Sequence, residues 1–319
     1  MSAMNRKIAG LAAIAIMMLL VFFQLPREEA VSEQARVLPT LKQQLAAVTE
    51  VSIESLDSDE SVTLVKQENG WLVKEKSGYP ADFEAVSELL GGLSELRVAE
   101  RKTAKPENHG RLGVAARGEG AGTLISVQTI SADAGEMLEL VVGKPAESRG
   151  SFVRRNGEDQ VYLTDAVVSA DTDVMSFVDA VIINVDSADV QSVAISGPGS
   201  YLSAGRSEAG AEMTLENLPV GAELKYDTVA DSLARLLINL RFTDVEPYDA
   251  SVFQSASLLK VTTFSRGEIE VNSTESAGEH WIHLANPDLE QWQYQVSEHT
   301  YNELNKSMSD MLKEQEDDD

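Results

Sequence analysis

Two kinds of hydrophobic pattern follow each other within residues 62–100, and the rest of the chain is organised around them. Apolar positions alternate on both sides of Asn69-Gly70, a pair typical of a type I′ hairpin turn. From residue 83 to 96, leucines and valines recur at three- and four-residue steps, which predicts an amphipathic helix that starts after Pro80 and Asp82. A hairpin followed by such a helix is typical of an α+β unit.

Strand-like patterns continue beyond this unit. Residues 38–48 have a helical pattern and lead into an alternating segment at 51–53. Asp165 is placed to cap a helix that runs to residue 175. Apolar or alternating segments between glycine-rich turns lie at residues 123–130, 137–142, 152–155 and 161–164.

The second half repeats this order. Residues 190–195 have the spacing of residues 48–53, and Leu96-Arg97-Val98 matches Leu240-Arg241-Phe242 at a separation of 144 positions. A helix is expected to begin near Asp227. Strand-like segments follow at 258–264, 269–272, 281–284 and 292–296, before a helix capped by Ser297. These repeats favour a tandem duplication; the alternative is that amphipathic helices and alternating strands resemble one another in any sequence.

An apolar segment follows Arg6 and Lys7. Residues 8–23 are all apolar or glycine and the run ends near Leu25, so residues 8–25 approach the length that spans a bilayer. A cleaved signal peptide is the alternative, but its apolar region is shorter and ends at small residues, whereas Arg27 follows here. The basic residues before the segment place the N-terminus in the cytoplasm and the bulk of the chain in the periplasm, as a single-pass inner-membrane protein.

Together these patterns predict an α+β protein: an N-terminal transmembrane helix followed by two tandem related α+β units with antiparallel sheets. Five divisions are expected in chain order: a cytoplasmic N-terminus and transmembrane anchor (1–30), a tether and short helix (31–47), the first repeat (48–180), the second repeat (181–306), and a helix end with an acidic tail (307–319).

Composition narrows the choice of partners. The chain has 52 acidic and 26 basic residues, a formal charge of -26, which repels phosphate backbones, so no nucleic-acid partner is expected. Cysteine is absent, which removes disulfides, thiolate catalysis, cysteine-based metal sites and the acylated cysteine of a lipoprotein.

Candidate catalytic motifs lack their structural context. His280 and His283 are three apart in a strand-like run, so they point to opposite faces and do not share a metal ion. Ser257 and Lys260 have the spacing of penicillin-binding enzymes, but the partner motifs are absent and the segment reads as a strand. We therefore expect no catalytic residue, cofactor or metal site.

Other polar and aromatic residues have structural interpretations. His109 and His299 are expected at the surface, in a turn and in the first turn of a helix. Trp71, Trp281 and Trp292 lie in strand-like segments, where core packing is expected.

Several short motifs, in order and spacing, resemble a known family. They are residues 38–41 leading into 48–53, Asn69-Gly70-Trp71, Gly78-Tyr79-Pro80-Ala81-Asp82, residues 101–103, Arg111-Leu112-Gly113, Gly143-Lys144 and residues 152–155. This frame resembles the domain-of-unknown-function family numbered 4340, closely up to about residue 196 and loosely beyond it. The structural signature is Trp71, Tyr79, Pro80, Asp82, Leu112 and Gly113.

The resemblance implies a location and a neighbourhood. Its members look like membrane-anchored extracytoplasmic proteins, often encoded beside ABC-transporter permeases and proteins similar to gliding-motility components. It carries no activity and no catalytic residue.

Three functional hypotheses remain. The first is a membrane-anchored periplasmic accessory or scaffold protein, associated with an ABC-type transport or cell-envelope system through a partner such as a permease. The second is a periplasmic module that binds a ligand in the groove between the two repeats. The third, an enzyme of unrecognised type, has the least support because no catalytic constellation is visible.

Overall fold

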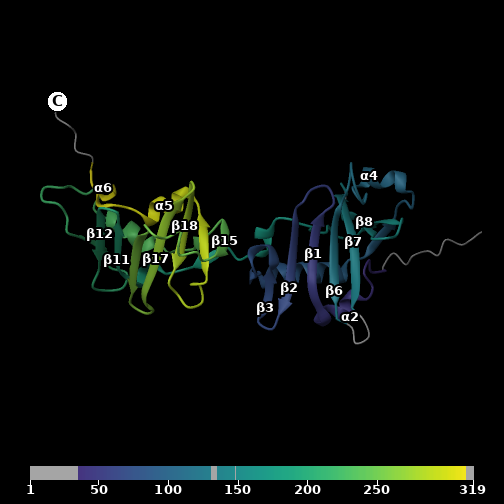
Figure 1. Cartoon of the computed structure of the whole chain (residues 1–319), viewed down its shortest axis with the longest axis horizontal. Coiled ribbons are helices and arrows are strands. Elements are labelled where there is room, and N and C mark those ends of the chain that lie inside the picture. The colour runs from purple at the N-terminus through teal and green to yellow at the C-terminus, as the bar shows by residue number, and fades with distance from the viewer. Residues whose placement is uncertain (1–34, 131–134, 148, 314–319) are drawn as a thin grey trace, which may run out of the picture.

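The computed structural model describes residues 35–130, 135–147 and 149–313. Within them, strands form two large antiparallel sheets and one small sheet, joined by one longer helix and several short ones. Figure 1 shows the two large sheets side by side along the long axis of the molecule, the first in purple to teal and the second in green to yellow. The predicted α+β class with antiparallel sheets is confirmed.

In the described part of the chain, the first sheet has nine strands in the order β4-β3-β2-β1-β6-β7-β8-β9-β5. All its neighbouring strands run antiparallel. The strands are β1 Val48–Ser55, β2 Ser61–Gln67, β3 Gly70–Val73, β4 Tyr79–Pro80, β5 Val98–Arg101, β6 Thr123–Thr129, β7 Glu136–Pro145, β8 Ser151–Arg155 and β9 Val161–Thr164.

The second sheet, counted over the same described residues, has eight strands in the order β13-β12-β11-β16-β17-β18-β19-β15. β10, which precedes β11 in the sequence, and β14, which lies between β13 and β15, form a separate two-stranded sheet. The strands are β10 Val181–Ile183, β11 Val190–Gly197, β12 Ser200–Gly205, β13 Thr214–Glu216, β14 Leu240–Arg241, β15 Asp244–Pro247, β16 Ser257–Thr263, β17 Gly267–Ser276, β18 Glu279–Leu284 and β19 Trp292–Val296.

The two sheets have the same connectivity. When β1 is matched to β11, the remaining strands of the second sheet follow the order of the first, and β4 alone has no counterpart. An irregularity also recurs: the register shifts between Val48 and Glu50 where β1 pairs with β6, and between Val190 and Ser192 where β11 pairs with β16. The correspondence therefore extends to individual residues.

Helix α3, Phe83–Glu95, connects β4 to β5 and covers one face of the first sheet. Its start is fixed as predicted, because the Asp82 carboxylate accepts hydrogen bonds from the backbone N–H groups of Glu84 and Ala85. The other helices are short; η denotes a 3-10 helix. They are α2 Leu41–Gln44, η1 Leu45–Ala47, η2 Lys74–Lys76, η3 Pro106–Asn108, α4 His109–Leu112, η4 Val174–Phe177, η5 Ser187–Asp189, η6 Val229–Arg235, α5 Glu298–Leu304 and α6 Met308–Met311.

Two helix predictions need correction. The helix expected near Asp227 is the 3-10 helix η6, preceded by Thr228, whose side chain makes no capping hydrogen bond. The helix expected from Asp165 does not form: residues 165–173 are not helical, and the Asp165 carboxylate instead accepts from the backbone N–H of Arg97 at 2.9 Å. Ser297, by contrast, caps α5 as predicted, accepting from the N–H of Thr300.

The hairpin and the two helix glycines also differ from expectation. Gln67 pairs with Gly70, so the central turn residues are Glu68 and Asn69, neither of which has a positive φ, and the type I′ prediction is wrong. A Cβ atom at Gly91 or Gly92 of α3 would meet no atom within 4 Å. A close approach to the sheet therefore does not explain these glycines.

Most buried hydrophobic residues of both halves belong to one contiguous cluster. A second, small cluster of Val114, Val141 and Val161 lies against residues such as Leu112 and Phe152. The three tryptophans Trp71, Trp281 and Trp292 are all buried, as predicted.

The predicted transmembrane segment, residues 8–25, lies outside the described residues, as does the acidic end of the chain at 314–319. Among the helices that are described, none combines the length and the apolar character needed to cross a bilayer.

Candidate functional site

The signature residues Trp71, Tyr79, Pro80 and Asp82 lie together where β3, β4 and α3 meet. Tyr79 and Pro80 form β4, which pairs with Val73 and Leu72 of β3. The N–H of Ala81 donates to the carbonyl of Trp71 at 2.8 Å. This part of the signature builds the start of α3 and the edge of the first sheet.

Leu112 and Gly113 lie apart from this group, at the end of α4. Gly113 has a φ of 76°, and a Cβ atom there would lie 2.9 Å from the backbone N of Lys144. The adjacent carbonyl of Val114 accepts from Nε of the buried Arg154 at 3.1 Å. The Leu112-Gly113 motif therefore fixes a close backbone contact with β7.

His109, expected at the surface, is buried instead. Its Nε2 lies 2.9 Å from the carbonyl oxygen of Asp159, so the imidazole ties α4 to the turn after β8. The helix packs close enough to the sheet to cover the ring, which the sequence pattern alone does not indicate.

Tyr79 also reaches the second half of the chain. Its ring centroid lies 5.7 Å from that of Phe242, 5.0 Å from Trp292 and 6.3 Å from Tyr294, each in an edge-to-face arrangement. Beside these rings, Lys76 Nζ lies 2.5 Å from Asp244 Oδ1. The edges of the two sheets are therefore joined by an aromatic cluster and a partly buried ion pair.

Burial shapes the chemistry of this cluster. Burial raises the pKa of the Tyr79 hydroxyl and also that of the Tyr294 hydroxyl. The Tyr294 hydroxyl is close enough to Tyr79 for each to affect the other's pKa, yet it satisfies hydrogen-bond geometry with no described residue. Both phenols stay protonated at neutral pH, which is the state expected of an interface held by packing.

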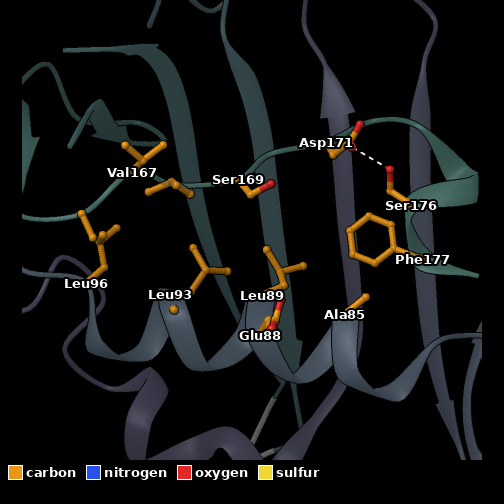
Figure 2. Close-up of a pocket in the computed structure, with 13 residues that line it drawn as sticks. Ala85, Glu88, Leu89, Leu93, Leu96, Val167, Ser169, Asp171, Ser176 and Phe177 are labelled. Carbon is orange, nitrogen blue, oxygen red and sulfur yellow. Dashed lines mark hydrogen bonds between the residues drawn. The ribbon is translucent and has the colours of Figure 1, made fainter. Parts of the chain in front are cut away.

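A cavity of about 360 Å³ lies in the first half, between α3 and the segment that follows β9. We call it the α3 groove. Figure 2 shows Leu89 and Leu93 of α3, and Leu96 directly after it, projecting toward the segment that carries Val167 and Phe177. Its lining residues are Ala85, Glu88, Leu89, Gly92, Leu93, Leu96, Ala166, Val167, Val168, Ser169, Asp171, Ser176 and Phe177.

The second wall of the groove is an extended segment held by hydrogen bonds. The backbone N–H of Val168 donates to Ser151 Oγ at 3.1 Å, and the Thr164 hydroxyl donates to the carbonyl of Ala166 at 2.6 Å. Val167, which lies between Ala166 and Val168, remains 64% exposed at the rim.

Asp171 and Ser176 lie at one end of the groove. Asp171 Oδ2 accepts from the Ser176 hydroxyl at 2.6 Å, the contact drawn in Figure 2. Neither Asp171 nor Glu88 pairs with a cationic side chain among the described residues. The groove thus combines apolar walls with two unneutralised carboxylates, which suits an apolar segment that carries a positive charge.

The residues of the candidate catalytic motifs make structural contacts. The His280 ring contacts Tyr301, whereas the buried His283 stacks on Tyr248 at 3.8 Å, so the two imidazoles have separate surroundings. Ser257 opens strand β16, and Lys260 pairs with two glutamates. Among the described residues, no three histidine, aspartate or glutamate side chains lie close enough together to hold a metal ion.

Sequence reasoning identified the residues around α3 but missed their partners. Phe242, Trp292 and Tyr294 lie more than a hundred positions from Tyr79, and no local pattern connects them. One feature of the sequence pointed to the groove: Gly92 interrupts the apolar face formed by Leu89 and Leu93 of α3 and by Leu96 directly after it.

A comparison with protein families matches the part of the chain that contains α3 and its groove. The family model described as "Domain of unknown function (DUF4340)" matches residues 71–258, more than half of the chain. The chain belongs to this family. The match begins at Trp71 and ends at residue 258, at the start of β16, so the DUF4340 region includes α3, its groove and Phe242 of the aromatic cluster. No curated protein matches the chain.

Proposed function

We propose that this protein is a membrane-anchored periplasmic accessory or scaffold protein that binds a partner protein through the α3 groove. A transporter permease or another component of an ABC-type or cell-envelope system is the partner class that we favour. The observation that carries the proposal is the apolar groove, which leaves Val167 largely exposed beside Leu89 and Leu93. Exposed apolar surface in a concave site favours protein contact.

The charge of the groove narrows the partner further. Glu88 and Asp171 would each be matched by a lysine or arginine of the incoming segment. The chain as a whole carries a formal charge of -26, which attracts basic partners over longer distances at low salt. We therefore expect an apolar segment flanked by basic residues, and binding that weakens as salt concentration rises.

The proposed anchor at residues 8–25 would contribute through confinement. Holding the groove in a thin layer beside the membrane raises the effective concentration of membrane partners, so a modest contact area is sufficient. Transfer of residues 31–319 to a soluble form should then restore little function to a deletion strain, and a foreign anchor should restore it. Mass spectrometry of the mature protein tests the anchor separately, since a start after Leu25 would mean that the segment is cleaved.

Crosslinking in intact cells tests the partner proposal. A photoreactive amino acid at Val167 should capture a membrane protein, because this side chain is exposed at the rim of the groove. The matched control is Val220, which is fully exposed in the second half and lies outside the groove. Equal capture at both positions, or none at Val167, would argue against the groove as the partner site.

An added negative charge provides the functional test. Val167→Glu adds a third carboxylate to the groove without disturbing a buried residue, so folding should be preserved while function is lost. Val220→Glu is the control for the added charge. Full function of an unanchored form, with no crosslinked protein, would instead favour the ligand-binding alternative.

We also infer that the two halves arose by tandem duplication. The support is the shared strand order, the repeated register shift at Val48 and Val190, and the separation of 144 positions between Leu96 and Leu240. If the two halves had instead arisen independently, all three features would have to have appeared twice by chance. Stable folding of residues 181–313 expressed alone would add support, since a duplicated unit carries its own core.

A further inference from the structure

A second cavity occupies the place in the second half that corresponds to the α3 groove. It has a volume of about 290 Å³ and lies between the η6–β14 segment and α5. We call it the α5 cavity. Its polar lining residues are Ser232, Arg235, Asn239, Arg241, His299, Thr300 and Glu303.

The two cavities are equivalent by position. One wall of each is the segment that precedes Leu96 or Leu240, two residues 144 positions apart. The other wall follows the last main strand of each half: Val167 is the third residue after β9, and His299 is the third residue after β19. The fold therefore forms a concave site at this place in both halves.

The charge at this place differs between the halves. At a separation of 144 positions, Ser232 replaces Glu88 and Arg235 replaces Gly91. His299 stands where Val167 stands in the first half. One carboxylate is lost and one guanidinium is gained, so the α5 cavity is locally basic on a chain with twice as many acidic as basic residues.

The side chains of Arg235 and Arg241 have no bonding partner among the described residues. Neither Arg235 nor Arg241 forms an ion pair or a side-chain hydrogen bond there, and both are exposed at the cavity. Glu303, the one acidic residue in the lining, has its carboxylate 2.6 Å from Lys306 Nζ. That lysine offsets the carboxylate and leaves the guanidinium charges unneutralised.

We propose that the α5 cavity binds a phosphate group. A phosphate monoester carries a charge of about -1.5 to -2 at neutral pH, which two guanidinium groups match, whereas one carboxylate would match only one. Guanidinium groups donate paired hydrogen bonds to phosphate oxygens, and the Asn239 amide supplies further donors. The volume of the cavity leaves room for the group to which the phosphate is attached. The ligand is a phosphorylated solute or a phospholipid headgroup.

Calorimetric titration of the full chain in neutral detergent tests this proposal and separates the two sources. The probes are inorganic phosphate, glycerol 3-phosphate and short-chain dihexanoyl phosphatidic acid, with potassium chloride at matched ionic strength as the reference. Binding of glycerol 3-phosphate and the lipid with equal affinity indicates a solute. A preference of more than tenfold for the lipid indicates a headgroup. If none of the three gives heat beyond that of chloride, the proposal is wrong.

Variants locate the binding. Arg235→Gln and Arg241→Gln should each weaken binding at least about tenfold. Each variant removes the charge-assisted hydrogen bonds of one of the two arginines that line the cavity. The matched control is Arg117→Gln, an exposed arginine of the first half that makes the same change in net charge. An unchanged affinity in both cavity variants, or an equal loss in the control, would overturn the proposal. Unaltered melting temperatures would show that all three variants remain folded.

Discussion

Replacing Gly92 with alanine separates the stability of α3 from the use of its groove. Gly92 is exposed, lies in the interior of α3 and lines the groove. A Cβ atom there would meet no atom within 4 Å, so the methyl group would cause no clash and would gain no packing. The only stability term left is backbone entropy, which favours alanine over glycine in a helix by about 0.5–1 kcal/mol.

Gly91 is the matched control. It lies in the same helix, its Cβ would also meet nothing within 4 Å, and it does not line the groove. Gly91→Ala and Gly92→Ala should therefore both raise the free energy of unfolding by about 0.5–1 kcal/mol. Urea unfolding followed by circular dichroism measures the change, as a shift of the midpoint without a change in slope.

The two variants should differ in function. The methyl group at Gly92 occupies groove space, so Gly92→Ala should reduce crosslinking from Val167, whereas Gly91→Ala should leave it unchanged. A variant that is more stable but binds less well cannot owe its defect to unfolding. Destabilisation of either variant would refute the open space around α3, and full crosslinking by Gly92→Ala would refute the groove as the partner site.

Four further predictions test the fold. Tyr79→Ala should cost about 3–5 kcal/mol because it removes three ring contacts between the halves, and Tyr79→Phe, which keeps the ring, should cost far less; equal losses would contradict the packing argument. Trp71→Ala should also cost about 3–5 kcal/mol, and a loss under about 1 kcal/mol would mean that the ring is exposed. Gly113→Ala should destabilise more than Gly157→Ala, since both have positive φ but only the first has backbone within reach of the new Cβ; thermal melting distinguishes them. Hydrogen bonds from Lys42 and Arg36 lower the pKa of Glu95 from 4.5 to about 2, so its stabilising contribution is present above pH 4.5 and is lost as the pH falls toward 2; a carboxyl resonance that titrates near 4.5 would refute this.

Local features of the sequence determined the elements around α3. The spacing of Val86, Leu90 and Leu93 predicted which face is buried, and Asp82 predicted where the helix begins. Both follow from interactions within one or two helical turns, so they need no knowledge of the rest of the fold. Strand alternation likewise placed the three tryptophans in the core.

Where local signals compete, tertiary contacts decided the outcome. Asp165 and Ser297 both precede segments that read as helices, but only Ser297 caps one. Asp165 instead accepts from the N–H of Arg97, and Val168 donates to Ser151, which holds this segment extended. The bonds come from residues 17 and 68 positions away, beyond the reach of a local pattern.

The candidate sites depend most on the tertiary structure. The sequence indicated Tyr79 as part of a signature, yet only the packing of the first half of the chain against the second brings it against Trp292 and Tyr294. In the same way, the order of strands β9 and β19 places Val167 opposite α3 and His299 opposite η6. Periodicity reports which face of an element is buried, because burial follows from local geometry. It does not report which distant element covers that face, and both proposed sites are formed by such a meeting.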